Sequence, residues 1–388
     1  MSLPRQIIPQ IPDVGANQQL LYALAEGTGG FVIVNTNDLL GGIERIANDQ
    51  GQYYLLGYHP PESAEGSCHI LKVKVDRGGT RVRSRSGYCK VKPHDLLAGS
   101  STEKDLESRS AGELPTNVTA SMQTPYFYTA PNVARVYLAM EIPSNALQFA
   151  KTNGKEHAAV NVLGIAYKPD GSIGARFSDT VNLDFDGKKD VEQFQKAPLQ
   201  YQNQFEIASG AYKLRVAFSS GDKSFGKLEK DLNVLPYDAK KIGVSSIALS
   251  NSMTKLSDLD TALDSQLLED RKPLVVSGLQ IVPSATNHFK KTDAGGAYIE
   301  IYDPAASGAQ PPQVGAEYRV VDAKTGEQKL DIAVTDTKKL MKPGNPMVPI
   351  GVKLPLDILP PGTYRVELRA LDSVGNSTDF QSVEFTVE

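Results

Sequence analysis

The sequence predicts a mainly β, multi-domain protein in which a partial α/β unit precedes two immunoglobulin-like or fibronectin-like β-sandwiches. Three observations predict this class. Helical periodicity is concentrated near the N-terminal end of the chain. From residue 116 onward, apolar and polar residues alternate in many short segments separated by Pro, Gly and Asp. Finally, the segment that begins with Gly-x-Tyr at Gly210 is similar to the segment that begins with Gly-x-Tyr at Gly362.

Composition bounds the number of domains and the classes of partner. At roughly 100–200 residues per domain, the 388 residues predict two to four domains. The 24 Pro, 33 Gly and 16 Tyr favour turn-rich β-structure. Lys+Arg at 41 against Asp+Glu at 45 gives a net charge of -4, which argues against nucleic acid as a partner of the whole chain. No apolar run reaches the roughly 18 residues of a membrane-spanning helix, so no transmembrane segment is expected in this chain.

Residues 4–98 are predicted to form one α/β unit that ends in a β-hairpin. Apolar residues at helical spacing precede the short apolar strand Phe31–Val34, and Asn37 is a suitable N-cap for a second helix. A helix–strand–helix order is typical of α/β folds. Tyr53–Tyr58 reads as a further strand, and residues 69–75 and 81–88 form the predicted hairpin around Gly78-Gly79.

The rest of the chain is divided by changes in pattern. Residues 99–115 contain almost no large apolar residue, so we expect a linker there. Residues 116–240 and 241–388 each show the density of short alternating segments that is typical of a sandwich. Within the second sandwich, leucines at helical spacing predict a helical insertion near residues 251–270.

We expect the two predicted sandwiches to be copies of one module. Gly210 and Tyr212 align with Gly362 and Tyr364, and in both copies an Asp and a final strand follow. The turns at Asp170-Gly171 and Thr325-Gly326 correspond more loosely. A tyrosine near the start of a strand can bury its ring and bond a neighbouring loop through its hydroxyl, as in the tyrosine corner of immunoglobulin-like domains. The alternative is that any two hairpins share such alternation.

Residues 17–90 resemble the C-terminal end of the von Willebrand factor A-related domain of many acidobacterial envelope proteins. The matching segments are Glu26–Gly30, Asn35–Leu40, Tyr53–Tyr58 and Arg81–Tyr88. The resemblance implies a truncated A-type domain, because the first strands are missing. It transfers no metal ligand, since the Asp-x-Ser-x-Ser pattern of the family's adhesion site does not occur in this chain. An extracytoplasmic location, in the periplasm, in the cell envelope or after secretion, is the corresponding expectation.

Two groups of residues are candidate sites. Cys68 and Cys89 each lie ten positions from the nearer glycine of the predicted turn, so they are expected to face each other within reach of a disulfide. The alternative is a pair of free thiols. Basic residues of the hairpin form the second group: Lys72, Lys74, Arg83 and Arg85. One interpretation is a weak binding surface for anionic polymers. The other is a solvated face of the hairpin or a sheet edge protected by charge, and the lack of interleaved aromatic residues favours this second interpretation.

No pattern in the sequence predicts catalysis. The five histidines are scattered, and no nucleophile elbow, phosphate loop or dinucleotide fingerprint occurs, so no catalytic residue, cofactor or metal site is predicted. We therefore expect a non-enzymatic interaction or adhesion protein with an unidentified protein or cell-surface ligand. Two alternatives stay open: accessory domains of an envelope enzyme whose catalytic part lies upstream, and a purely structural stalk.

Overall fold

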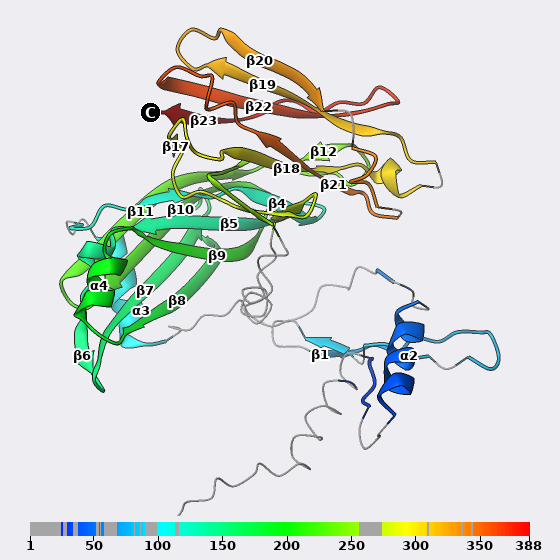
Figure 1. Ribbon diagram of the computed structural model, residues 1–388, viewed down its shortest axis with the longest axis horizontal. Coiled ribbons are helices and arrows are strands. Elements are labelled where there is room, and N and C mark those ends of the chain that lie inside the picture. The colour runs from blue at the N-terminus through cyan, green and yellow to red at the C-terminus, as the bar shows by residue number, and fades with distance from the viewer. Residues whose placement is uncertain are drawn as a thin grey trace, which may run out of the picture. The chain divides into compact units, whose positions relative to one another are not determined.

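The computed structural model (Figure 1) shows a mainly β protein with several sheets. It describes residues 25, 29–33, 38–51, 54, 56–57, 68–80, 82–85, 87–89, 99–112, 116–255, 274–308, 310–334, 337–342 and 344–388. The chain divides into two compact units, Met1–Lys92 and Pro93–Glu388, called here the N-terminal and the C-terminal unit. The sequence placed the end of the first unit at residue 98.

The N-terminal unit contains one described helix, α2 (Leu39–Gln50), and a short hairpin of β1 (Cys68–Ile70) and β2 (Gly87–Cys89). The N-cap of α2 is Asp38, one residue later than expected, and its carboxylate accepts a hydrogen bond of 2.9 Å from the Gly41 N–H. The predicted hairpin strands over 69–75 and 81–88 are wrong in length, because residues 71–76 and 82–85 have no strand pairing.

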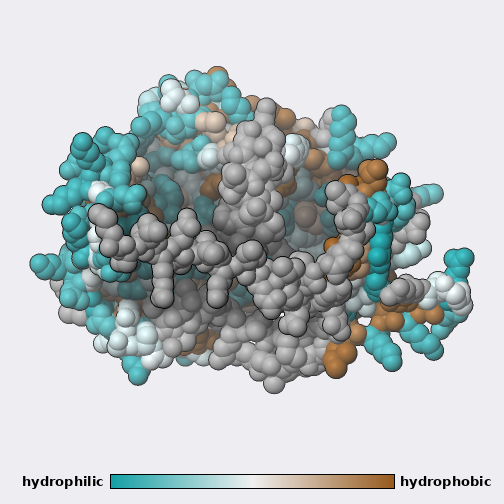
Figure 2. All heavy atoms as spheres, turned by 60° about the horizontal axis from the view of Figure 1, so that its bottom comes forward, coloured by the Kyte–Doolittle hydropathy of each residue, from teal (hydrophilic) through white to brown (hydrophobic). Residues whose placement is uncertain are grey.

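Other predictions for the N-terminal unit fall largely outside the described residues. These are the first helix, of which only Ala25 is described, and the strand Tyr53–Tyr58, of which Tyr54, Leu56 and Gly57 are described without strand structure. Several apolar side chains of this unit are exposed, among them Leu40 and Ile43 of α2. On the face of the molecule drawn in Figure 2, hydrophobic residues form separate groups among mostly hydrophilic ones.

The first sandwich of the C-terminal unit packs two sheets around one core. One sheet consists of β3 (Ser121–Gln123), β4 (Tyr126–Ala130), β5 (Val133–Ile142) and β9 (Leu199–Ala208). The other consists of β6 (Ala150–Thr152), β7 (Lys155–Tyr167), β8 (Ile173–Phe185), β10 (Gly210–Ser220) and β11 (Ser224–Val234). Alternating residues of both sheets, such as Leu138, Val162 and Leu214, are fully buried between them.

The second sandwich repeats this arrangement. Its first sheet consists of β12 (Gly243–Val244), β13 (Ala248–Ser250), β18 (Gly296–Tyr302) and β21 (Met347–Lys353). The opposing sheet consists of β17 (His288–Phe289), β19 (Val314–Asp322), β20 (Gln328–Val334), β22 (Gly362–Asp372) and β23 (Gln381–Val387). A small third sheet contains β14 (Ser252–Lys255), β15 (Leu274–Val276) and β16 (Leu279–Val282).

The predicted repeat is confirmed by the wiring and by the tyrosines. The order β11-β10-β7-β8 in the first sandwich matches β23-β22-β19-β20 in the second. The hydroxyl of Tyr212 donates to the Ala208 carbonyl (3.0 Å), and that of Tyr364 donates to the Pro360 carbonyl (2.8 Å), four residues back in each copy. A Cβ at Gly174 of β8 would lie 2.3 Å from the ring of Tyr212, so this corner also requires glycine at that position.

The expectation of a linker over residues 99–115 is wrong for Ser101–Ala111, which form helix α3 on the outer face of the β7–β10 sheet. Ser100 caps its first turn, since the Ser100 hydroxyl accepts from the Glu103 N–H at 3.0 Å. Leu106 is the one large apolar side chain of the helix and is 0% exposed. Arg176 of β8 donates to Glu103 (3.1 Å from Nε). A single leucine and an ion pair thus replace the apolar stripe expected of a helix.

Three short helical segments complete the described elements of the C-terminal unit. They are α4 (Lys188–Phe194), which the sequence did not predict, and the 3₁₀ turns Ser144–Ala146 and Pro304–Ser307. The helix predicted near 251–270 lies outside the described residues from 256 to 270, and residues 252–255 belong to β14. No helix in the described parts of the chain has the length and apolar character needed to cross a membrane.

Candidate functional site

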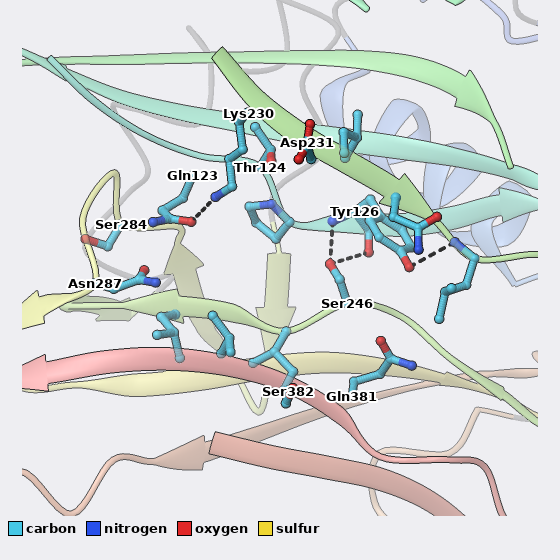
Figure 3. Close-up of a pocket in the computed structure, with 17 residues that line it drawn as sticks. Gln123, Thr124, Tyr126, Lys230, Asp231, Ser246, Ser284, Asn287, Gln381 and Ser382 are labelled. Carbon is cyan, nitrogen blue, oxygen red and sulfur yellow. Dashed lines mark hydrogen bonds between the residues drawn. The ribbon is translucent and has the colours of Figure 1, made fainter. Parts of the chain in front are cut away.

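A cleft of about 310 Å³ lies between the two sandwiches of the C-terminal unit (Figure 3). Its volume is at the lower end of the range of small-ligand sites. The first sandwich contributes residues 123–126, from the end of β3 to the start of β4, together with residues 230–233 and Leu235 at the end of β11. The second contributes residues 246–247, Leu249, Ser284, Asn287 and residues 381–383 at the start of β23. The cleft therefore depends on how the two sandwiches are joined.

Hydrogen bonds of the β4 backbone join the two sandwiches at the cleft. The Tyr126 N–H donates to the Ser246 hydroxyl (2.6 Å), and the Ser246 N–H donates to the Tyr126 carbonyl (3.2 Å). Nearby, the Tyr128 N–H donates to the hydroxyl of Tyr302 (2.8 Å). These bonds join β4 of the first sandwich directly to the second sandwich.

Aromatic rings and one carboxylate complete the junction. The ring of Phe127 packs edge-on against Tyr298, with centroids 5.4 Å apart. The hydroxyls of Tyr298 (3.1 Å) and Tyr302 both donate to the Glu300 carboxylate. Burial and the neighbouring Glu300 raise the pKa of both tyrosines, so both hydroxyls stay protonated and keep donating. We infer that the junction is rigid.

Lys230 supplies the positive charge of the cleft. Its Nζ donates to the Gln123 side-chain oxygen at 2.5 Å, as Figure 3 shows. In the described part of the chain, no carboxylate lies within 4 Å of this ammonium group; the neighbouring Asp231 instead pairs with Lys213 at 3.8 Å. Burial lowers the pKa of Lys230. An ammonium group has three donors, and Gln123 occupies one, so Lys230 can bind a further acceptor.

The other polar groups of the cleft are mostly neutral amides and hydroxyls. They come from both sandwiches: Gln123, Thr124, Asn233, Ser246, Ser284, Asn287, Gln381 and Ser382. Such groups both donate and accept hydrogen bonds without changing charge. Together with the Lys230 ammonium, this lining suits recognition of a polar ligand with an anionic group.

Burial of Lys230 has a consequence for stability that can be measured. Its pKa in the folded protein lies below the unfolded value of about 10.4, so between these two values the unfolded state binds more protons. Stability therefore rises with pH across that window. We expect Lys230→Met to be more stable than the wild type at pH 7 and to lose this advantage as the pH approaches about 10.4. Unfolding free energies of both proteins at pH 7 and pH 10 test this; an advantage independent of pH would contradict it.

The predicted basic surface lies in the N-terminal unit and is not part of the cleft. Lys72, Lys74, Arg83 and Arg85 are exposed in segments without strand pairing. Arg83 is already engaged, because its guanidinium pairs with Asp49 and lies 4.7 Å from the ring centroid of Phe31. The anionic-polymer interpretation of the remaining three stays a prediction.

The backbone places Cys68 and Cys89 opposite each other. They are paired positions in the β1–β2 ladder, and the pairs His69–Tyr88 and Ile70–Gly87 follow in the predicted register. The disulfide itself stays a prediction. We expect non-reducing mass spectrometry of secreted protein to find the two peptides joined, and we expect Cys68→Ser to destabilise the N-terminal unit by about 3 kcal/mol. Free thiols in the protein from an oxidising compartment would contradict this.

Comparison with known proteins assigns no family. No protein-family model and no curated protein matches the chain. Solved structures with some similarity include dimeric latent PorU from Porphyromonas gingivalis (TM-score 0.23, 9% identity, 70% of this chain and 24% of that chain). The Parabacteroides merdae β-glucuronidase matches with a TM-score of 0.18 and 12% identity, over 66% of this chain and 28% of that chain. The Endo-D glycoside hydrolase domain of Streptococcus pneumoniae matches with a TM-score of 0.14 and 8% identity, over 69% of this chain and 37% of that chain. The chain spans well under half of each structure, and TM-scores this low support no conclusion about function.

Proposed function

We propose that this chain is a non-catalytic interaction protein of the cell envelope or the extracellular space, and that it binds a polar ligand in the cleft between its two sandwiches. The observation that carries the proposal is Lys230, a partly buried ammonium group without a carboxylate partner in the described residues, set among neutral hydrogen-bonding side chains. A buried charge lowers stability unless it is paired. A group of this kind at a cleft favours a binding role over a structural one.

The rigid junction supports the same proposal. A site that is formed by two domains binds well only if its walls are already in place, because ordering them on binding costs affinity. Here the hydrogen bonds between Tyr126 and Ser246 and the ring contact of Phe127 with Tyr298 hold the walls in the absence of ligand.

The proposal is tested with an array of glycans and a displayed library of short random-sequence peptides, each probed with the full chain. We expect at least one class to bind the wild type and to bind Lys230→Met at least about tenfold more weakly, the loss expected for one charged hydrogen bond. Lys155→Met is the matched control, because Lys155 is an exposed lysine of β7 that pairs with Asp186 outside the cleft.

Two outcomes would overturn the proposal. The three proteins could bind every ligand equally, which would place binding outside the cleft. Alternatively, none of them binds any ligand, which would support a purely structural stalk.

A further inference from the structure

We propose that the ligand of the cleft is an extended peptide with an acidic side chain, which adds as a strand to the free edge of β11. This inference rests on the proposed function and specifies its ligand. Three features carry it: the direction of the backbone groups of β11, the free edge of β23 across the cleft, and the position of Lys230.

The direction of the β11 backbone groups follows from Phe225. Its N–H donates to the Asn117 side-chain oxygen (2.9 Å), and its carbonyl accepts from the N–H groups of Asn117 (3.1 Å) and Val118 (3.2 Å). These partners lie away from β10, which pairs with the other edge of β11. Backbone groups of successive residues in an antiparallel pair point alternately toward and away from the partner strand. The odd-numbered residues of β11 therefore point away from β10.

This alternation leaves two residues of β11 open at the cleft. Asp231 and Asn233 are odd-numbered and line the cleft. Within the described residues, neither their N–H groups nor their carbonyls have a hydrogen-bond partner. At Leu235, just beyond the end of β11, the N–H is taken up again, because it donates to the Tyr126 hydroxyl at 3.2 Å. The cleft thus contains a short row of free donors and acceptors with the spacing of a β-ladder.

The equivalent strand of the second sandwich, β23, is open in the same way but over a shorter length. The N–H of Thr386 donates to the Asn287 carbonyl (2.7 Å), and the side chain of Asn287 donates to the Glu384 carbonyl (2.7 Å). By the same alternation, Ser382 points its backbone groups outward into the cleft, and they have no partner among the described residues. An occupant bonded to β11 would therefore have hydrogen-bonding groups of β23 on its other side.

Lys230 specifies the charge of the occupant. Side chains of successive residues lie on opposite faces of a strand, so the Lys230 ammonium and the Asp231 carboxylate lie on opposite faces of β11. Asp231 is thereby kept with Lys213 and away from the ligand. A peptide that pairs with Asp231 and Asn233 would place alternate side chains on the Lys230 face. An acidic side chain at such a position would take up the free donors of Lys230.

A peptide fits these features better than a sugar. Strand addition uses main-chain bonds for affinity and side-chain contacts for specificity, and both are available here. The aromatic residue of the lining, Tyr126, is only 5% exposed and offers no ring face to a sugar.

The experiment uses the full chain to select binders from the displayed random-sequence peptides, followed by synthesis of the selected peptides. We expect the selected sequences to be enriched in Asp and Glu, and to bind Lys155→Met like the wild type and Lys230→Met at least about tenfold more weakly. Each peptide is then made in two forms that carry N-methyl groups on alternate sets of backbone amides. Strand addition predicts that one form binds normally and that the affinity of the other falls at least about tenfold, because only one set of amides faces β11.

The outcomes separate this inference from the function on which it rests. If peptide binding depends on Lys230 but tolerates both methylation patterns, strand addition is overturned and the proposed function stays intact. If glycans bind in a way that depends on Lys230 and no peptide binds, strand addition is likewise overturned and the proposed function stays intact. A Lys230→Met variant that binds both libraries like the wild type would overturn both.

Discussion

Tyr298→Ala is expected to lower the free energy of unfolding of the C-terminal unit by about 3–5 kcal/mol, the range for large aromatic residues removed from a core. Tyr298 is 1% exposed, and its ring packs against Phe127 across the junction of the two sandwiches. The variant leaves a cavity at the junction and removes the hydroxyl that donates to Glu300. Guanidinium unfolding, followed by tyrosine fluorescence because the chain has no tryptophan, measures the loss.

The matched control for this prediction is Tyr298→Phe. It keeps the ring and removes only the hydroxyl bond to the Glu300 carboxylate, so the loss should be about 1.5–3 kcal/mol. Because the junction forms the cleft, Tyr298→Ala should also weaken the binding of any ligand whose binding depends on Lys230. Tyr298→Phe should largely retain that binding. A Tyr298→Ala protein with wild-type stability would show that the ring contact does not hold the sandwiches together.

Leu106→Ala is expected to lower the free energy of unfolding by about 2–5 kcal/mol and to release α3 from its sheet. Leu106 is 0% exposed and packs against Leu163, Ile165 and Phe225. The helix also contributes the ion pair of Glu103, which is 7% exposed, with Arg176, and the cost of burying these charges offsets much of their attraction. Hydrogen exchange of the amides of residues 101–111 should therefore become much faster in the variant.

Lys104→Ala is the control for α3, because Lys104 is exposed on the same helix. An exposed substitution of this kind should change stability by no more than about 0.5 kcal/mol. If amide exchange in α3 were equally slow in the wild type and in Leu106→Ala, the ion pair of Glu103 with Arg176 would be the main attachment instead.

Local patterns predicted much of the fold. The alternation after residue 116 and the two Gly-x-Tyr segments predicted the sandwiches and their repeat, because a tyrosine corner depends on residues only four positions apart. The same reasoning predicted the register that pairs Cys68 with Cys89. Helix α3 was missed because one leucine gives no periodic signal, although the Ser100–Glu103 capping pair was visible in the sequence.

The cleft could not be predicted in this way. Lys230 in β11, Ser246 between β12 and β13, and Ser382 in β23 are far apart in the chain and meet only when the two sandwiches dock. Periodicity describes which face of a strand is buried, whereas docking depends on which loops and strand ends of two finished modules fit together. The one local signal was a lysine, Lys230, on the inward-facing alternation of β11 between Leu228 and Leu232.

A strand that is open to a guest peptide is open to other copies of the same protein as well. Self-association through exposed strand edges is a general hazard of β proteins, and charged or amide side chains along the edge limit it. In β11 this protection comes from Lys230, Asp231 and Asn233, which are the residues at the cleft. Recognition and solubility therefore depend on the same few side chains, and substitutions that make this edge more apolar are expected to weaken both.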